Sequence, residues 1–400
     1  MRKGQFDIPL AIVFFCLMLF GVVMVSSVSV YQSYQITSAM AAKGLISEPT
    51  NSFYLWRHVW RALISVPLCF LMIYFPLNAW KKAALPLFVV AILLLVALFL
   101  PGVGANYGTS TSWISIPLLP SLQPAEFVKL ALIFYLAVWM EKRQELVQSF
   151  QYGFIPFTIL LSLVVILLAL QPDFGSVLVI SVMAACMFFA AGGNVFHIFA
   201  GGLMAAALAY PIIMSKEYIR NRFMVFLNPD LDPLKIGFQI KQALIAIGSG
   251  GWFGVGFGKS IQKFGYLPEV QGDTIFAAAS EELGFIRIVF LLAAYFYIAY
   301  KGYSIANRAP NRFAMLVAVG ITSWFVFQAV INMGVNLSLL PLTGITMPFI
   351  SYGGSSLIAN MIAAGILLNI SRYAEGNTNP THRRGVGGAY TAKPRARVRA

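Results

Sequence analysis

The sequence predicts an all-α membrane protein, with about ten transmembrane helices and a large external loop between the seventh and the eighth. Hydrophobic residues make up 59% of the 400 residues and charged residues only 10%, whereas soluble domains carry about 25% charged residues. The apolar residues occur in long runs, each close to the roughly 20 residues that cross a bilayer. The longest polar stretch, 215–273, separates two of these runs.

The apolar runs define the expected spans. The first run follows Arg2 and Lys3 and exceeds the apolar region of a signal peptide, so an uncleaved first helix is expected. The expected spans are 8–30, 58–76, 83–100, 123–140, 152–170, 174–191, 195–214, 274–300, 313–336 and 354–371.

Basic residues in the short joints predict the orientation. With ten spans, the Lys and Arg residues of 77–82, 141–151 and 301–312 fall on the same side as both termini. Positive charge marks the cytoplasmic side, so both termini are expected inside and 215–273 outside. Residues 1–373 form one transmembrane domain, and the basic tail 374–400, rich in Gly, Arg and Thr, is expected to be disordered in the cytoplasm.

Composition excludes several classes of site. Cys16, Cys69 and Cys186 each lie in an apolar run and lack metal-ligand spacing, and the three histidines are far apart. The net charge of +14 comes largely from the tail and the joints, so it does not indicate nucleic acid. The external stretch nevertheless carries basic residues that suit an anionic partner: Lys216, Arg220, Arg222, Lys235, Lys241, Lys259 and Lys263.

The stretch 237–285 concentrates the features of a functional site. It holds six glycines between Gly248 and Gly258. Their spacing does not match a phosphate-binding P-loop, because three residues rather than four separate Gly254 from Gly258. A flexible or re-entrant segment is the better interpretation. Lys259 and Lys263 would present two ammonium groups together if this piece were helical.

Acidic residues follow the glycines. Asp273 stands where the eighth span begins, which suits either a helix N-cap or a general base acting on a hydroxyl. Glu269 precedes it. Of Glu281 and Glu282, one is expected to face a cavity and the other to pair within the bundle.

Further polar residues lie near the starts of other spans, on the same side of the membrane as 215–273. Glu126 and Lys129 share a helix face and form either a structural ion pair or a wall of a polar cavity. Asp173 is expected to cap the sixth span. Arg57 would contact either lipid phosphate or a substrate phosphate. Ser351 lies in the last external loop, 337–353, whose hydroxyls favour a turn ending in a helix cap.

Five motifs together resemble the SEDS family of membrane-embedded peptidoglycan polymerases, the FtsW and RodA proteins, over nearly all of 8–372. The sequence of 254–269 is closer to the cell-division branch. The motifs are QPAEFVK at 123–129, QPDFGS at 171–176, GFQIKQALIAIGSGGWFGVGFGKSIQKFGYLPE at 237–269, EELGF at 281–285 and PFISYGGSS at 348–356.

The resemblance implies a peptidoglycan glycosyltransferase that polymerises lipid II at the outer face of the bacterial cytoplasmic membrane during cell division. It implies Asp273 as the catalytic residue and matches Arg57, Glu126 and Lys129 to family positions. Lipid II, a class B penicillin-binding transpeptidase and other divisome membrane proteins are the implied partners. The substrate-binding candidates are Arg57, Glu126, Lys129, Asp173, Lys259, Lys263, Glu269, Glu281 and Ser351.

Two alternative functions remain open, and the sequence departs from the family pattern at several positions. A transporter of the lipid-linked precursor would use a similar charged cavity, and a non-catalytic divisome scaffold would need none. A divalent cation, Mg²⁺ or Mn²⁺, or the lysines would stabilise the leaving diphosphate.

Where the family has His and Thr before the aspartate, this chain has Gln271 and Gly272. It has Ser110 to Ser112 in place of an arginine pair, and Arg287 in place of a glycine.

Overall fold

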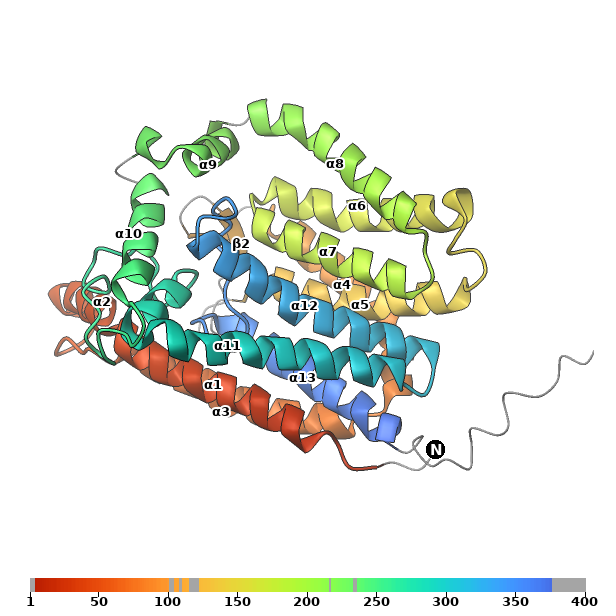
Figure 1. Ribbon diagram of the computed structural model, residues 1–400, viewed down its shortest axis with the longest axis horizontal. Coiled ribbons are helices and arrows are strands. Elements are labelled where there is room, and N and C mark those ends of the chain that lie inside the picture. Colours follow the sequence, from red (N-terminus) through yellow and green to blue (C-terminus); the bar gives the residue numbers. More distant parts are fainter. Residues whose placement is uncertain are drawn as a thin grey trace, which may run out of the picture.

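The computed structural model describes residues 4–100, 104–107, 110–114, 122–215, 217–232 and 236–375. Its helices run in roughly one direction and form a bundle, with the N-terminus at one end and α2, α9, α10 and β2 at the other (Figure 1). The expected disordered tail lies almost wholly outside the described residues, because α13 ends at Glu375.

Each of the ten expected spans is a helix, so the all-α fold class is confirmed. Among the described residues, six helices are long and apolar enough to cross a membrane, and Phe174–Ala190 and Val195–Ala207 are shorter apolar helices; the count of ten crossings stays a prediction. The helices are α1 (Ile8–Val28), α3 (Phe53–Tyr74), α4 (Leu77–Ala97), α5 (Pro124–Lys142), α6 (Ile155–Leu170, preceded by a π-helical turn, Phe150–Phe154), α7 (Phe174–Ala190), α8 (Val195–Ser215), α11 (Ile275–Asn307), α12 (Arg312–Asn336) and α13 (Gly354–Glu375).

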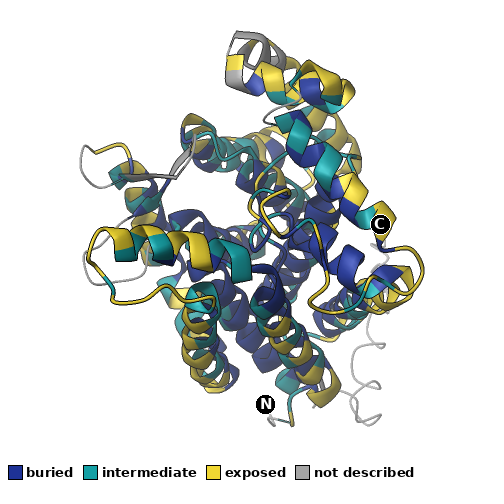
Figure 2. Ribbon diagram, turned by 90° about the vertical axis from the view of Figure 1, so that its left-hand side faces the viewer, coloured by how far each residue is buried: buried dark blue, intermediate teal, exposed yellow. Residues whose placement is uncertain are grey.

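The core of the bundle is formed around α12 and α13. Nearly every residue of α12 is buried, and this helix packs against α5, α7, α11 and α13. Such a position suits a helix that is predominantly apolar around its circumference. α13 packs closely on α3, because a Cβ at Gly365 would meet the Cys69 carbonyl oxygen at 2.4 Å. Seen from the end that carries α2 and α10, buried residues occupy the centre and exposed ones the rim (Figure 2).

The stretch 215–273, which the sequence predicts to be external, has more structure than a loop. It contains α9 (Glu217–Leu227), a 3₁₀ turn (Pro229–Leu231) and α10 (Ile236–Ser249), followed by turns up to α11. Lys259 and Lys263 lie in those turns, so the expectation that a helix presents them together is wrong. α2 (Val30–Ala42) and a two-stranded antiparallel hairpin, β1 (Gly104–Tyr107) and β2 (Ser110–Ile114), occupy the same end of the bundle.

α11 is longer than expected and is interrupted. It extends over 33 residues, and Gly284 inside it has φ 75° and ψ 172°, which is not a helical conformation. Such a left-handed φ is accessible to glycine at low cost because glycine has no Cβ. The interruption comes directly after Glu281 and Glu282, the acidic residues singled out in the sequence.

Candidate active site

Asp273 lies in the loop before α11, and its backbone is fixed by two side chains of α12. Asn332 and Asn336 each donate a hydrogen bond from Nδ2 to the carbonyl oxygen of Asp273, at 2.8 Å and 2.9 Å. Asn332 also donates to the carbonyl oxygen of Ile345, at 2.8 Å. Since the two asparagines are four residues apart, one face of α12 aligns the Asp273 loop with the loop 337–353.

The Asp273 side chain is not a helix cap. The N-cap position of α11 belongs to Thr274, and no side-chain capping bond forms there. Asp273 Oδ1 is enclosed and has no hydrogen-bond partner among the described residues. An enclosed polar atom without a partner calls for an explanation. The capping interpretation is therefore wrong, and the carboxylate is left available for chemistry.

The surroundings of Asp273 favour a proton acceptor. Burial, and after it the charge of Glu269, raise the pKa of Asp273 to about 7, while Gln239 and Arg222 oppose the rise. A general base works best when its pKa is close to the pH at which it operates. Glu269 itself is exposed and has a left-handed φ of 48°.

The guanidinium of Arg222 on α9 supplies positive charge at this site. Arg222 is not among the candidate site residues identified from the sequence. Its Nη1 donates to the carbonyl oxygen of Leu342 at 2.9 Å. Burial lowers the pKa of Arg222, and the carboxylates of Asp273 and Asp173 raise it. The guanidinium therefore lies within electrostatic reach of both carboxylates. The signal in the sequence was its position among basic residues on the side where such residues are unusual.

Asp173 caps α7, as expected, and lies at a junction of three helices. Its Oδ1 accepts from Ser176 N at 3.0 Å, and Gln123 Nε2 donates to its Oδ2 at 3.5 Å. The backbone N–H of Gln123 donates to Ser355 Oγ at 2.9 Å. The first turns of α5, α7 and α13 thus meet beside Arg222.

Glu126 and Lys129 form a buried ion pair, which supports the structural interpretation. Lys129 Nζ lies 2.8 Å from Glu126 Oε1 and 2.7 Å from Gln328 Oε1, and it lies 4.7 Å from the centroid of the Trp324 ring. Gln328 Nε2 in turn donates to the Thr346 carbonyl at 2.9 Å. The pair therefore connects α5 to α12 and to the loop 337–353, on the α12 face that also carries Asn332 and Asn336.

Ser351 and Arg57 differ in their access to a substrate. Ser351 is buried, and its Oγ accepts from Met347 N at 2.8 Å, so it shapes the last loop. The N–H of Tyr352 donates to the Gln271 carbonyl at 2.8 Å, which ties that loop to the Asp273 loop. Arg57 is exposed, with its guanidinium 4.2 Å from the centroid of the Phe53 ring, and it stays a candidate for contact with a phosphate.

Lys263 and Glu281 do not face a cavity that holds Asp273. Lys263 is buried, with Nζ 3.0 Å from Glu282 Oε1 and 2.6 Å from the Gly258 carbonyl oxygen. Glu281 accepts from Ser260 Oγ and from Ile261 N. Both glutamates therefore have internal partners, and the expectation that one faces a cavity is not met. Lys259 is exposed.

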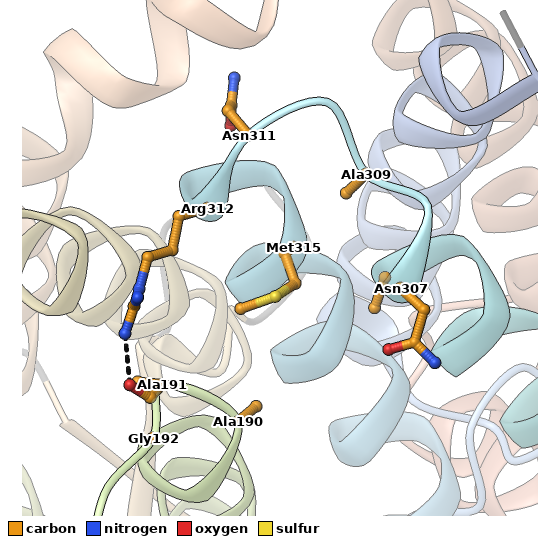
Figure 3. A pocket seen from close by; sticks show the side chains of 9 residues that line it. Ala190, Ala191, Gly192, Asn307, Ala309, Asn311, Arg312 and Met315 are labelled. Carbon is orange, nitrogen blue, oxygen red and sulfur yellow. Dashed lines mark hydrogen bonds between the residues drawn. The ribbon is translucent and has the colours of Figure 1, made fainter. Parts of the chain in front are cut away.

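A separate cavity lies away from Asp273. It measures about 490 Å³ and is lined by the end of α7 and the joint between α11 and α12 (Figure 3). Arg312 points toward the Ala191 carbonyl there and donates a hydrogen bond to it. This is the opposite end of α7 and α12 from Asp173 and Asp273, roughly 30–36 Å along α12 by helix rise from the asparagines that contact Asp273. The cavity is therefore not part of the Asp273 site.

Known proteins resemble this chain over nearly its whole length. The family model FTSW_RODA_SPOVE, described as cell cycle protein, matches residues 8–376. A probable peptidoglycan glycosyltransferase FtsW from Trichlorobacter lovleyi is 36% identical, with 92% of this chain and 94% of the relative covered. Stage V sporulation protein E of Bacillus subtilis is 38% identical, with 93% and 99% covered.

Solved structures also resemble this chain over nearly its whole length. A chain of a peptidoglycan synthase complex, studied for its structural coordination of polymerization and crosslinking, matches with a TM-score of 0.74 at 27% identity, covering 92% of this chain and 98% of that one. The rod shape determining protein RodA of Thermus thermophilus matches with a TM-score of 0.66 at 26% identity, covering 92% and 97%. The chain belongs to the FtsW/RodA/SpoVE family of cell cycle proteins.

Proposed function

We propose that this chain is a peptidoglycan glycosyltransferase that polymerises lipid II at the outer face of the cytoplasmic membrane during cell division. The observation that carries the proposal is Asp273: its Oδ1 is enclosed and unpartnered among the described residues, and its pKa is about 7. Relatives that share 36% and 37% of their residues with this chain are named probable peptidoglycan glycosyltransferase FtsW.

The reaction proceeds as a displacement at a sugar carbon. Asp273 accepts the proton of a hydroxyl on the acceptor sugar, and that oxygen bonds to the anomeric carbon of the donor sugar. The bond between this carbon and the diphosphate oxygen breaks, and the polyprenyl diphosphate leaves with the electron pair. Arg222 offsets the charge that develops on the leaving group, with exposed Arg57 and Lys259 as further candidates. Lys263 is committed to Glu282 and is withdrawn from this role.

A divalent cation, Mg²⁺ or Mn²⁺, remains part of the proposal. Among the described residues, no group of three or more His, Cys, Asp and Glu side chains has the geometry of a metal site. Mg²⁺ is commonly held by one or two carboxylates together with substrate phosphates. Exposed Glu269, beside Asp273, is the carboxylate that fits such shared binding, and the ion would supply additional charge compensation.

The test of the function is glycan synthesis by the purified protein. Labelled lipid II is supplied to the protein alone and to the protein with a class B penicillin-binding transpeptidase, the partner that we propose. A ladder of glycan strands and release of polyprenyl diphosphate are expected, with more product in the presence of the partner. Lipid II that is translocated across vesicles but never polymerised would support a transporter, and neither product would support a scaffold.

We expect Asn332→Ala to impair catalysis through the position of Asp273. The substitution removes the donor to the Ile345 carbonyl and one of the two donors to the Asp273 carbonyl, which keeps its bond from Asn336, and each unsatisfied buried acceptor costs about 1–3 kcal/mol. Asn369→Ala is the matched control, because Asn369 donates to the Met72 and Phe75 carbonyls at the other end of the bundle. Thermal unfolding and turnover of lipid II are measured for both variants.

Both asparagine variants should lose stability to a similar extent, and Asn332→Ala alone should lose turnover per folded molecule. Asn332→Gln, which keeps an amide, should recover part of it. Equal turnover in the two alanine variants would show that Asn332 serves stability only.

The proposed orientation is tested by cysteine labelling in intact cells. After Cys16, Cys69 and Cys186 are replaced, Asn221→Cys on α9 should react with a membrane-impermeant thiol reagent. Glu145→Cys, exposed in the 141–151 joint, should react only after the cells are opened. The reverse pattern would place the Asp273 site in the cytoplasm and overturn the proposed topology.

A further inference from the structure

Residues 250–266, here called the aromatic lobe, are attached to the interruption in α11. The non-helical Gly284 frees backbone groups on both sides of it, and the lobe pairs with them. Val255 N and Gly256 N donate to the carbonyls of Glu281 and Glu282 at 3.0 Å and 3.1 Å, and Phe285 N and Ile286 N donate to those of Gly251 and Trp252 at 2.9 Å and 3.2 Å. A Cβ at Gly254 would lie 2.2 Å from the Glu282 carbonyl oxygen, so this close approach requires glycine.

Charged side chains hold the lobe in the same place. Glu282 accepts from Ser27 Oγ of α1 at 2.6 Å and pairs with Lys263 of the lobe. Arg287 Nη1 donates to the Phe253 carbonyl at 2.6 Å, which gives this arginine a role that the sequence did not suggest. The lobe is therefore a docked structure and not the flexible segment expected from its glycines.

The contacts of α1 define the depth of the lobe. α1 has 21 residues, about 31 Å of helix, which matches a hydrocarbon core of about 30 Å. Asp7, at its start, lies 2.9 Å from Lys301 Nζ, and Ser27, near its other end, bonds to Glu282. α11 therefore crosses the core between Glu282 and Lys301, and the lobe, bonded to 281–286, lies at the boundary away from the N-terminus.

The surface of the lobe suits that boundary. Its exposed side chains are mostly aromatic, and Phe253 is 72% and Trp252 66% exposed. This surface continues into exposed Phe285 and Phe290 of α11, on the face that is expected to meet lipid. Aromatic residues are enriched at membrane interfaces. The other exposed large apolar residues of the lobe are Val255, Phe257, Ile261, Phe264 and Tyr266.

We propose that the aromatic lobe is inserted into the outer leaflet, at the boundary between headgroups and acyl chains, with exposed Lys259 at the level of the lipid phosphates. The outward direction rests on the proposed function and its topology. Tyr266 precedes Asp273 by seven residues, so the lobe fixes the height of the Asp273 loop relative to the membrane. That height suits a substrate whose diphosphate lies at the membrane surface and whose lipid lies below it.

Spin labels on the lobe test the insertion. In a background without the three native cysteines, Phe257→Cys and Ile261→Cys are labelled and reconstituted in bilayers of phosphatidylcholine and phosphatidylglycerol. Collision with O₂ and with a water-soluble nickel chelate is measured. Phe290→Cys on α11 is the lipid reference, and Glu48→Cys in an exposed loop is the water reference. Both lobe labels should show an O₂-to-nickel collision ratio well above that of Glu48→Cys and below that of Phe290→Cys, because Phe290 lies about 12 Å deeper along α11 by helix rise.

Two results would overturn the insertion. Ratios close to that of Glu48→Cys would place the lobe in water, and low collision with both reagents would show that protein covers it. Each labelled variant is first assayed for lipid II polymerisation. A variant that polymerises lipid II but carries water-exposed labels contradicts the insertion alone, whereas unlabelled protein that makes no glycan contradicts the proposed function.

Discussion

Asp273→Asn is expected to lower the rate of lipid II polymerisation about 10²–10⁴-fold. Asparagine has nearly the same shape as aspartate but cannot accept the proton of the attacking hydroxyl. The bonds that fix this loop are made to the Asp273 carbonyl by Asn332 and Asn336, so the substitution leaves them in place. Rates are measured on equal amounts of folded protein with labelled lipid II.

The stability of Asp273→Asn distinguishes loss of the general base from loss of the folded structure. Because the pKa of Asp273 is raised from its ordinary value to about 7, its ionisation destabilises the native state as pH rises between those two values. At pH 8 the asparagine variant should therefore be at least as stable as the parent protein. Asp230→Asn, in the same external stretch and paired with Lys241 on the surface, is the matched control and should keep its rate. An active Asp273→Asn enzyme would direct attention to Glu269.

Lys129→Ala is expected to destabilise the protein by about 3–5 kcal/mol, because it leaves Glu126 charged, buried and without its partner. It also removes the ammonium contact to Gln328 Oε1. Folded yield and the midpoint of thermal unfolding in detergent should fall together, and total activity with them.

An exposed ion pair provides the control for Lys129. Lys81 Nζ lies 2.6 Å from Glu141 Oε2, with the Lys81 side chain 42% exposed, and removing such a pair costs about 0–1 kcal/mol. Lys129→Met combined with Glu126→Gln should recover part of the lost stability, since no buried charge is left unpaired. If Lys129→Ala unfolded at the same temperature as Lys81→Ala, the buried pair would not be a structural element.

The helices could be predicted because their signal is local. Each apolar run of about 20 residues has few alternatives to a helix in a bilayer, and all ten expected runs are helices. Asp173 as the cap of α7 follows from the same kind of local rule. The interruption at Gly284 was not predicted, because a single glycine in a long apolar run does not by itself indicate a break.

The partners of the charged residues could not be read from the sequence. Lys263 pairs with Glu282 and bonds to Ser27, which is 236 residues away. Arg222 reaches the Leu342 carbonyl across 120 residues. Sequence neighbours suggested instead that Lys259 and Lys263 act together, and offered a helix cap as one role for Asp273.

One missed feature did have a sequence signal. Gln328, Asn332 and Asn336 recur every four residues within an apolar span, and polar residues in such a span face the bundle interior. This spacing predicts a polar stripe on one helix face. The spacing does not identify the group that Asn332 and Asn336 contact, which is the carbonyl of Asp273.

The pH dependence of polymerisation tests the role of Asp273 most directly. The purified protein, with its transpeptidase partner, is given labelled lipid II from about pH 5 to about pH 9, and initial rates are compared with those of Asp273→Asn. A base must be deprotonated to act, so the parent rate should rise with pH and reach half its maximum near pH 7, while the residual rate of the variant shows no such rise. A parent rate that is flat or falls through pH 7, or a variant with the same profile as the parent, would contradict the assignment of Asp273 as the general base.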